Sequence, residues 1–543
     1  VEVFSFDLLK EAYLKAKKKH RKNGSVLIPY LKENNHYKIK NKKLNIQGDF
    51  KKIRLTVDEK VDLELIKKLY DNFKPNIYFN YKDIAKFYNK NKSFFNKNSH
   101  LKLNEGSILD KSQKIWRRAN GIILGGNSLL SKNPNLFLPN KWPTYFSKAK
   151  GCKIWDLNKK QYFDMSLMGV GTNILGYSNN EVDNAVKKVI DKSTVSSLNC
   201  VEEVYLAERL IKMHTWADKV KFARTGGEAN ALAVRIARAA SGKEKVAFCG
   251  YHGWHDWYLA ANLKSKKSLD KHLIKGLSPL GVPKSLSDSS FGFEYGNYNQ
   301  LEKITNKYSI GVIKMEVCRN SQPNIKFLKQ VRKLASKKKI ILIFDECTTG
   351  FRQSYGGIHK SIGINPDMAI LGKALGNGYP ITAVLGKEEI MDAARNSFMS
   401  STFWSERIGP TAGIKTLEIM EKNKTWLKIT SLGKKLINIW KKLAARHKLN
   451  LVITGIPALA KFSINSKNFQ EYKTYISQQM LDKGFLASNG VYLSVSHNQN
   501  IFNKYETVLD KIFYDISLCE KEKKSINEIL KYPVSHLPFE RLN

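Results

Sequence analysis

The chain has 543 residues, more than one small core supports, so two or more domains are expected. Hydrophobic residues make up 42% and aromatic residues 11%, as in an ordinary folded protein, and no apolar run reaches the roughly 20 residues of a membrane helix, so no membrane partner is expected. The formal net charge of +44 would suit a polyanion partner, but Lys, Asn and Ile are abundant along the whole chain and the basic residues form no block with interleaved aromatics, so we expect no specific nucleic acid.

The six cysteines are scattered, without a C-x-x-C pair or a grouping with histidine. This pattern indicates a reducing, cytoplasmic setting and no metal site. Charges interrupt every apolar stretch of the first twenty residues, so no signal peptide is expected. The missing initiator methionine indicates a fragment or a processed product.

Residues 1–95 are expected to form a first domain, followed by a polar, Asn/Lys-rich linker at 96–120. The stretch IRLTVDEKVDLELIKKLYDNF, residues 53–73, resembles the C-terminal end of the cytidylyltransferases that activate acidic sugars and related polyols. The resemblance implies that Asp58 stands where those enzymes help to bind a metal. The nucleotide-binding half of that family does not precede it, so we interpret the segment as truncated. It suggests surface-glycan metabolism as the context.

From about residue 121 onward, apolar runs of strand length alternate with amphipathic runs of helix length. This alternation is typical of an α/β protein with a mostly parallel central sheet flanked by helices. We expect a large domain over residues 121–425 and a smaller α+β C-terminal subdomain over residues 426–543, with a strand pair within 451–464. The expected strands of the large domain lie within 219–225, 245–250, 309–317, 340–346 and 367–375, and the clearest helices within 227–242 and 324–339.

Unusual residues follow four of these strands, and ligands of open α/β sheets bind at the carboxyl ends of strands. Thr225, Gly226 and Gly227 lie between a strand and a helix N-terminus, where backbone N–H groups and the helix dipole favour a phosphate. An ordinary tight turn is the alternative. Tyr251 follows the next strand, where it can stack on a flat ring or pack within an aromatic loop.

The third strand ends near Glu316 and Asn320, which offer polar groups to an exocyclic oxygen of a ligand or simply cap a turn. The fourth strand runs directly into Asp345. A buried, ionised carboxylate needs a cationic partner, which can be Arg or Lys, a metal or a protonated ligand nitrogen. Lys373 lies between a short apolar strand and a Gly-rich turn, where a partly desolvated amine can act as nucleophile and base, although most lysines are surface groups.

Together these groups are an anion cradle, a stacking aromatic ring, an acid for a ring nitrogen and an amine for an aldehyde. Pyridoxal 5'-phosphate (PLP) carries the complementary group for each of them. On this interpretation the cationic partner of Asp345 is the pyridinium nitrogen of the cofactor.

The motifs IFDECTTGFR and LGKALGNGYP resemble those of the class III aminotransferases of PLP fold type I. TGGEAN, YHGWHDW and STFWSERIGPTAG are most similar to the branch related to glutamate-1-semialdehyde 2,1-aminomutase. The resemblance covers about residues 110–543. It implies that Lys373 bonds to the aldehyde carbon of the cofactor, that Asp345 pairs with the ring nitrogen, and that Gly226 and Gly227 bind the phosphate.

The same resemblance places Tyr251 over the cofactor's ring and Asn320 near its phenolic oxygen. It implies that Thr402, in STFWSE, reaches the phosphate of the neighbouring subunit's cofactor. A homodimer with shared active sites follows from that role.

The resemblance implies a PLP-dependent aminotransferase that passes an amino group from a small-molecule donor to a carbonyl acceptor, in surface-glycan or nucleotide-sugar-related metabolism. One alternative is glutamate-1-semialdehyde 2,1-aminomutase itself, which needs no external donor. Lys132, at the end of GGNSLLSK, stands where the aminomutase has Arg, and this difference favours the aminotransferase. A fragment of a bifunctional nucleotidyltransferase–aminotransferase and a polyanion-binding protein are the remaining alternatives.

Overall fold

The computed structural model describes residues 53–57, 60–98, 111–265, 267–270, 272, 276–318 and 320–537. The chain forms two compact units, one of Val1–Asn133 with Pro143–Tyr145 and the other of Pro134–Trp142 with Phe146–Asn543. Residues 1–52 and Asp58, on which part of the N-terminal resemblance depends, lie outside the described residues. The divisions expected at residues 95, 120 and 425 stay predictions.

The described part of the first unit is helical. Leu65 and Leu69 are buried against Phe95 in a small apolar core. Beside them Arg54 and Asp62 form a buried ion pair of 3.0 Å. The described helices are α4 (Lys60–Phe73), α5 (Tyr81–Lys90), α6 (Lys111–Ile122) and the 3-10 helices η2 (Lys92–Asn98) and η4 (Leu130–Lys132).

The second unit is built around a seven-stranded sheet. Its strands are β4 (Lys219–Ala223), β5 (Lys245–Cys249), β6 (Ser290–Gly292), β7 (Ile310–Glu316), β8 (Ile341–Asp345), β9 (Met368–Leu371) and β10 (Thr382–Gly386). They lie in the order β4-β10-β9-β8-β7-β5-β6. The ladders from β9 to β6 are parallel, and β10 runs antiparallel to both β9 and β4. The mostly parallel central sheet predicted from the alternating pattern is confirmed.

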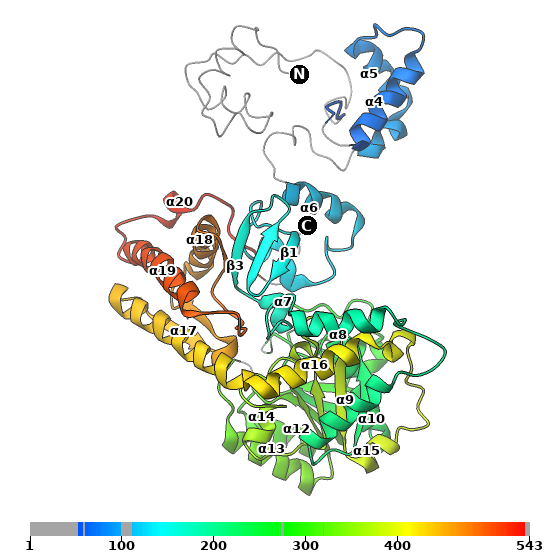
Figure 1. Cartoon of the computed structure of the whole chain (residues 1–543), viewed down its shortest axis with the longest axis vertical. Coiled ribbons are helices and arrows are strands. Elements are labelled where there is room, and N and C mark those ends of the chain that lie inside the picture. The colour runs from blue at the N-terminus through cyan, green and yellow to red at the C-terminus, as the bar shows by residue number, and fades with distance from the viewer. Residues whose placement is uncertain are drawn as a thin grey trace. The chain divides into compact units, whose positions relative to one another are not determined.

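Helices cover both faces of this sheet (Figure 1). Alternation along the strands sends Val312 and Ile343 into the apolar cluster under helix α10, whereas Ile313 and Leu342 join the cluster on the opposite face. Buried parallel strands are apolar on both sides for this reason. The helices of the large part of this unit are α7 (Met168–Gly171), α8 (Asn180–Ile190), α9 (Val201–Met213), α10 (Gly226–Ser241), α11 (Asp256–Leu259), α12 (Tyr298–Lys307), α13 (Ile325–Lys337), α14 (Ile358–Ser361), α15 (Glu388–Asp392) and α16 (Ile408–Asn423).

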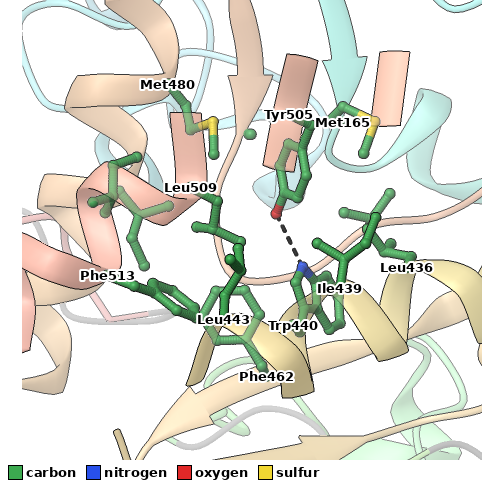
Figure 2. Packing of buried hydrophobic residues seen from close by; sticks show 14 of the residues in the cluster. Met165, Leu436, Ile439, Trp440, Leu443, Phe462, Met480, Tyr505, Leu509 and Phe513 are labelled. Atoms are coloured by element: carbon green, nitrogen blue, oxygen red, sulfur yellow. Dashed lines mark hydrogen bonds between the residues drawn. The ribbon is translucent and has the colours of Figure 1, made fainter. Parts of the chain in front are cut away.

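A smaller α+β portion joins segments from both ends of the second unit. A four-stranded sheet has the order β1-β2-β3-β13, and a separate antiparallel hairpin, β11–β12, confirms the strand pair predicted within residues 451–464. In the core between the helices, Trp440 Nε1 donates a hydrogen bond of 3.2 Å to the Tyr505 hydroxyl (Figure 2). The elements are β1 (Phe146–Lys150), β2 (Lys153–Asp156), β3 (Gln161–Met165), α17 (Thr425–His447), β11 (Leu451–Thr454), β12 (Lys461–Ile464), α18 (Phe469–Asp482), β13 (Phe485–Ala487), α19 (Gln499–Glu520) and α20 (Ile526–Ile529).

The helices within the described ranges differ from membrane-spanning helices. None of them is both long enough and apolar enough to cross a bilayer.

Candidate active site

The carboxyl edge of the seven-stranded sheet brings the predicted site residues together, with the exception of Thr402. Asp345 ends β8 and lies in register beside Glu316, which ends β7. Lys373 opens the 3-10 helix η8 (Lys373–Gly376) just after β9. Thr225 and Tyr251 follow β4 and β5. Parallel strands place their carboxyl ends on one edge, so segments more than a hundred residues apart meet here.

Asp345 is buried and held by three neighbours. Its Oδ2 atom lies 2.8 Å from His252 Nδ1 and 3.7 Å from Lys314 Nζ. Its Oδ1 atom accepts a hydrogen bond of 3.1 Å from the backbone N–H of Cys347. Burial alone would raise the pKa of this carboxyl, but Lys314 and His252 outweigh it and hold the pKa well below its usual range. The carboxylate is therefore ionised at neutral pH.

Lys373 is held in a tight turn at the same edge of the sheet as Asp345. Its Nζ donates a hydrogen bond of 2.8 Å to the Thr348 hydroxyl. Its backbone has φ +45°, in the left-handed region that costs a non-glycine residue about 1 kcal/mol. The preceding Gly372 has no room for a side chain, because a Cβ there would lie 2.8 Å from Cys347 Sγ. Strained positions of this kind cluster at functional sites.

The N-terminus of α10 forms a bare backbone surface. Thr225 caps the helix in a capping box with Glu228, since Glu228 N donates to Thr225 Oγ1 over 3.3 Å and Thr225 N donates to Glu228 Oε2 over 2.7 Å. A Cβ on Gly226 would lie 3.2 Å from Cys347 Sγ, and one on Gly227 3.3 Å from the His255 ring. The buried His255 Nε2 atom has no hydrogen-bond partner among the described residues. These groups fit an anion such as a phosphate.

Glu316, Tyr251 and Asn320 lie around the same edge. The Glu316 Oε2 atom accepts a hydrogen bond of 3.1 Å from Tyr251 N, so this acid fixes the loop that carries the tyrosine. The half-buried Tyr251 ring meets the Tyr258 ring edge to face, with centroids 6.1 Å apart. Asn320 is exposed and lines a narrow cavity together with Thr348.

Thr402 lies apart from this cluster, on an exposed 3-10 helix, η9 (Thr402–Ser405). Trp404 of this segment forms hydrogen bonds with residues at the N-terminus of α10. The Trp404 carbonyl accepts a hydrogen bond of 2.7 Å from Arg224, and its Nε1 donates one of 3.4 Å to Glu228. The Thr402 side chain is exposed in the single chain.

The sequence prediction gave three residues of the site no role. His252 stands in the quoted aromatic motif, and Thr348 follows Asp345 by three positions, so proximity to known motifs could have indicated both. Lys314 interrupts an otherwise apolar strand. A charged residue in such a run is the feature of the sequence that could have indicated a role in the site. Among the residues that the structure describes, no cluster of three His, Cys, Asp or Glu side chains could hold a metal.

The arrangement fits a cofactor with a phosphate, a basic ring nitrogen and an aldehyde. The glycines at the helix N-terminus and His255 Nε2, which has no hydrogen-bond partner in the described part of the chain, suit the phosphate. The ionised Asp345 suits a protonated ring nitrogen, and the Lys373 amine suits the aldehyde. PLP has all three groups.

Sequence relatives point the same way. The chain is 31% identical over 375 residues to a 3-aminobutyryl-CoA aminotransferase of Cloacimonas acidaminovorans, covering 67% of this chain and 86% of that protein. It is 28% identical over 434 residues to a glutamate-1-semialdehyde 2,1-aminomutase of Archaeoglobus fulgidus, covering 78% of this chain and 100% of that protein.

Solved structures share the fold. The FumI protein of Sphingopyxis sp. MTA144, solved with PLP, superposes with a TM-score of 0.69 at 22% identity over 77% of this chain and 99% of that chain. A glutamate-1-semialdehyde aminomutase of Pseudomonas aeruginosa superposes with a TM-score of 0.64 at 17% identity over 75% and 94% of the two chains. The expected fold type I is thereby confirmed. The family model for class-III aminotransferases matches residues 139–501, so the chain belongs to this family of enzymes and its cofactor is PLP.

Proposed function

We propose that the chain is an aminotransferase in which Lys373 and Asp345 act on the cofactor. The observation that carries this proposal is the meeting of an ionised, buried carboxylate and a turn-held amine at one edge of the sheet. When bound, PLP supplies an electron sink for the bond cleaved at the amino-bearing carbon of the donor. Asp345 would hold the protonated ring nitrogen, and the N–H groups at Gly226 and Gly227, at the start of α10, would hold the phosphate.

Lys373 moves the proton. Its Nζ would take the proton from the amino-bearing carbon of the donor and later return one on the acceptor side. The Thr348 hydroxyl, 2.8 Å away, holds the amine in position between these steps. Tyr251 would lie over the ring of the cofactor, and Glu316 fixes its loop by accepting a hydrogen bond of 3.1 Å from Tyr251 N.

A single-turnover experiment tests amino transfer. The purified chain, loaded with PLP, is mixed with L-glutamate, and the 2-oxo acid is counted by mass spectrometry. About one 2-oxo acid per site is expected, and none in Lys373→Ala. Lys387→Ala, at the opposite edge of the sheet beside Asp367, is the matched control and should behave as the unchanged chain. Product from Lys373→Ala at the unchanged rate would contradict the role of Lys373.

The aminomutase alternative is favoured by the relatives that carry this name, among them the Archaeoglobus fulgidus protein. The two reactions differ in the external donor. Conversion of glutamate 1-semialdehyde into its 1-amino isomer by the chain loaded with the amino form of the cofactor, without any donor, would support the aminomutase. Requirement for glutamate or another donor in every turnover would support the aminotransferase.

We infer further that the enzyme is a homodimer. Val201, Val204 and Tyr205 share one face of α9 and are 55%, 54% and 56% exposed, although they are apolar. Val204 lines a surface hollow together with Ser401 and other residues of the segment 400–405, and Phe403 in that segment is 67% exposed. This surface adjoins Thr402, which the resemblance to class III aminotransferases places at the cofactor phosphate of the neighbouring subunit.

Light scattering tests the dimer. The unchanged chain is expected at twice its mass of 62.0 kDa, and Val204→Glu, which places a charge in the interface, at the single mass. Val452→Glu, on the hairpin strand β11 with 47% exposure, is the control and should stay dimeric. A Val204→Glu chain that remains dimeric would exclude this face as the interface.

A role in surface-glycan metabolism and a bifunctional nucleotidyltransferase–aminotransferase both rest on one observation, the resemblance of residues 53–73 to the C-terminal end of a cytidylyltransferase. Mass spectrometry tests the setting directly. A nucleotide-linked keto sugar incubated with the enzyme and glutamate is expected to gain an amino group. Failure with keto sugars but turnover with small 2-oxo acids would exclude the glycan setting.

A further inference from the structure

The ammonium group of Lys314 is buried near Asp345, where the packing of the sheet does not require a charge. Lys314 stands inside β7, a strand in which every position is buried, and its side chain is 0% exposed. Its Nζ makes no hydrogen bond with any described residue, and its contact with Asp345 Oδ2 is an ion pair of 3.7 Å. Taking a cation out of water without hydrogen bonds is costly, so a strand position of this kind would ordinarily hold an apolar residue.

The register of the strands explains where this ammonium lies. Lys314 pairs with Ile343 and Glu316 with Asp345, and directly paired residues of neighbouring strands point to the same face. The lysine therefore extends along the face covered by α10, toward the carboxyl edge of the sheet. Four titratable groups act on it there: Asp345, Cys347, Glu316 and His252. The acid of α10 itself, Glu228, is bound to the backbone N–H groups of Thr225 and Arg224.

One carboxylate thus has two basic neighbours before any ligand is considered. Burial lowers the pKa of Lys314 to about 8, although Asp345 acts in the opposite direction. Burial, and then Lys314, lower the pKa of His252, so the imidazole is the weaker base of the two. At pH 7 the ammonium of Lys314 is the main countercharge of Asp345, and it is close to losing its proton.

We infer that Lys314 is a positioning residue for the ring of the cofactor: it keeps Asp345 ionised and in place before the cofactor binds, and it releases its proton to solvent when a pyridinium nitrogen pairs with Asp345. The reason is electrostatic, since two cations that share one buried carboxylate repel each other. The ammonium yields because, among the residues that the structure describes, it makes no hydrogen bond within the usual distance and is held only by the 3.7 Å ion pair with Asp345. This inference rests on the proposed pairing of Asp345 with the ring nitrogen.

Proton counting by calorimetry tests the inference. Pyridoxamine phosphate, which has no aldehyde and forms no bond with Lys373, is titrated into the full chain freed of cofactor, at pH 7 in two buffers of different ionisation heat. The unchanged chain is expected to release about one proton more than Lys314→Met, and this difference should vanish above about pH 9, where the lysine is already neutral. Met keeps the length of the side chain and removes a buried charge, so the variant should fold.

Matched variants separate the possible outcomes. Lys245→Met changes a lysine of the neighbouring strand β5 at its opposite end and should release as many protons as the unchanged chain. Lys314→Arg, whose charge cannot be lost, should bind pyridoxamine phosphate at least about tenfold more weakly than Lys314→Met. Equal proton release by the unchanged chain and Lys314→Met would overturn the inference.

A separate variant tests the premise. Asp345→Asn should weaken the binding of pyridoxamine phosphate by about tenfold or more, because a carboxylate–pyridinium pair is lost. If Asp345→Asn binds as tightly as the unchanged chain, the proposed pairing of Asp345 itself is wrong. If Asp345→Asn binds weakly while Lys314→Met leaves proton release unchanged, the pairing stands and only the role of Lys314 fails.

Discussion

At the scale of single residues, the chemistry of this enzyme depends on which groups surround each charge. Asp345 is an ordinary acid by type, yet His252 and Lys314 keep it ionised in a buried position where burial alone would favour the neutral form. Lys373 is one of many lysines, and its position in a strained turn beside Thr348 sets it apart. The positions of both residues at strand ends could be predicted from the sequence. The groups that contact them could not, because they come from other segments of the chain.

Removing the hydroxyl that holds Lys373 should slow proton transfer. We expect Thr348→Val to lower the single-turnover rate with glutamate by about tenfold, since a hydrogen bond to a charged group is worth about 1.5–3 kcal/mol and about 1.4 kcal/mol corresponds to tenfold. Stopped-flow absorption measures this rate. Thr454→Val, which lines the same narrow cavity, is the control. A rate in Thr348→Val equal to that of the control would mean that the hydroxyl does not position the amine.

At the scale of elements, close contacts between distant segments hold the small α+β portion together. Helix α17 passes so near the 3-10 helix η10 (Pro457–Leu459) that a Cβ on Gly433 would lie 2.1 Å from the Pro457 carbonyl oxygen. Strand β13 pairs in parallel with β3, more than three hundred residues earlier in the chain. The geometry of the subdomain therefore depends on small residues at the contacts.

Adding one methyl group at the closest contact should be costly. Gly433→Ala forces the backbone of η10 away from α17, so we expect the free energy of unfolding to fall by about 3 kcal/mol. Urea denaturation measures this change. Gly363→Ala has open space around its Cβ but a backbone with φ +65°, so it serves as a control for backbone strain alone, and its loss should be smaller, about 1 kcal/mol. An equal loss of unfolding free energy in Gly433→Ala and Gly363→Ala would show that the contact between α17 and η10 is not tight.

The limits of prediction from sequence follow from the same contacts. Apolar runs and helical periodicity were sufficient to predict the positions of β7, β8 and α10 in the chain, because local burial determines these patterns. The partnership of β13 with β3 has no local signal, since a pairing across more than three hundred residues is decided by the whole fold. Lys314 could be placed in a strand, but its position under Asp345 depends on the register between β7 and β8, which the sequence alone does not reveal.

At the scale of the whole molecule, buried histidines link stability to pH. Glu346 accepts a hydrogen bond of 2.6 Å from His359 Nδ1, and His359 Nε2 accepts one of 3.2 Å from Trp216. The His214 ring stacks on His359 with centroids 5.5 Å apart. Burial lowers the pKa of His214 from 6.5 to about 4. The folded chain therefore keeps this imidazole neutral where the unfolded chain would protonate it.

This shift predicts a loss of stability in mild acid. The stabilisation from the neutral His214 is complete above about pH 6.5, and it is lost as the pH falls toward about 4, where the folded chain also takes up the proton. A shift of this size corresponds to roughly 3 kcal/mol. The midpoint temperature of unfolding should change less steeply with pH between 4 and 7 in His214→Phe than in the unchanged chain. An unchanged slope in His214→Phe would contradict the prediction.

The most direct test of the central claim identifies the lysine that holds the cofactor. Borohydride makes the bond between a lysine amine and the aldehyde carbon of PLP permanent, and digestion followed by mass spectrometry then locates the added mass. The peptide that contains Lys373 is expected to carry it, and the visible absorption of the protein should disappear on reduction. The mass on another lysine, for example Lys314, or on no lysine at all, would contradict the account.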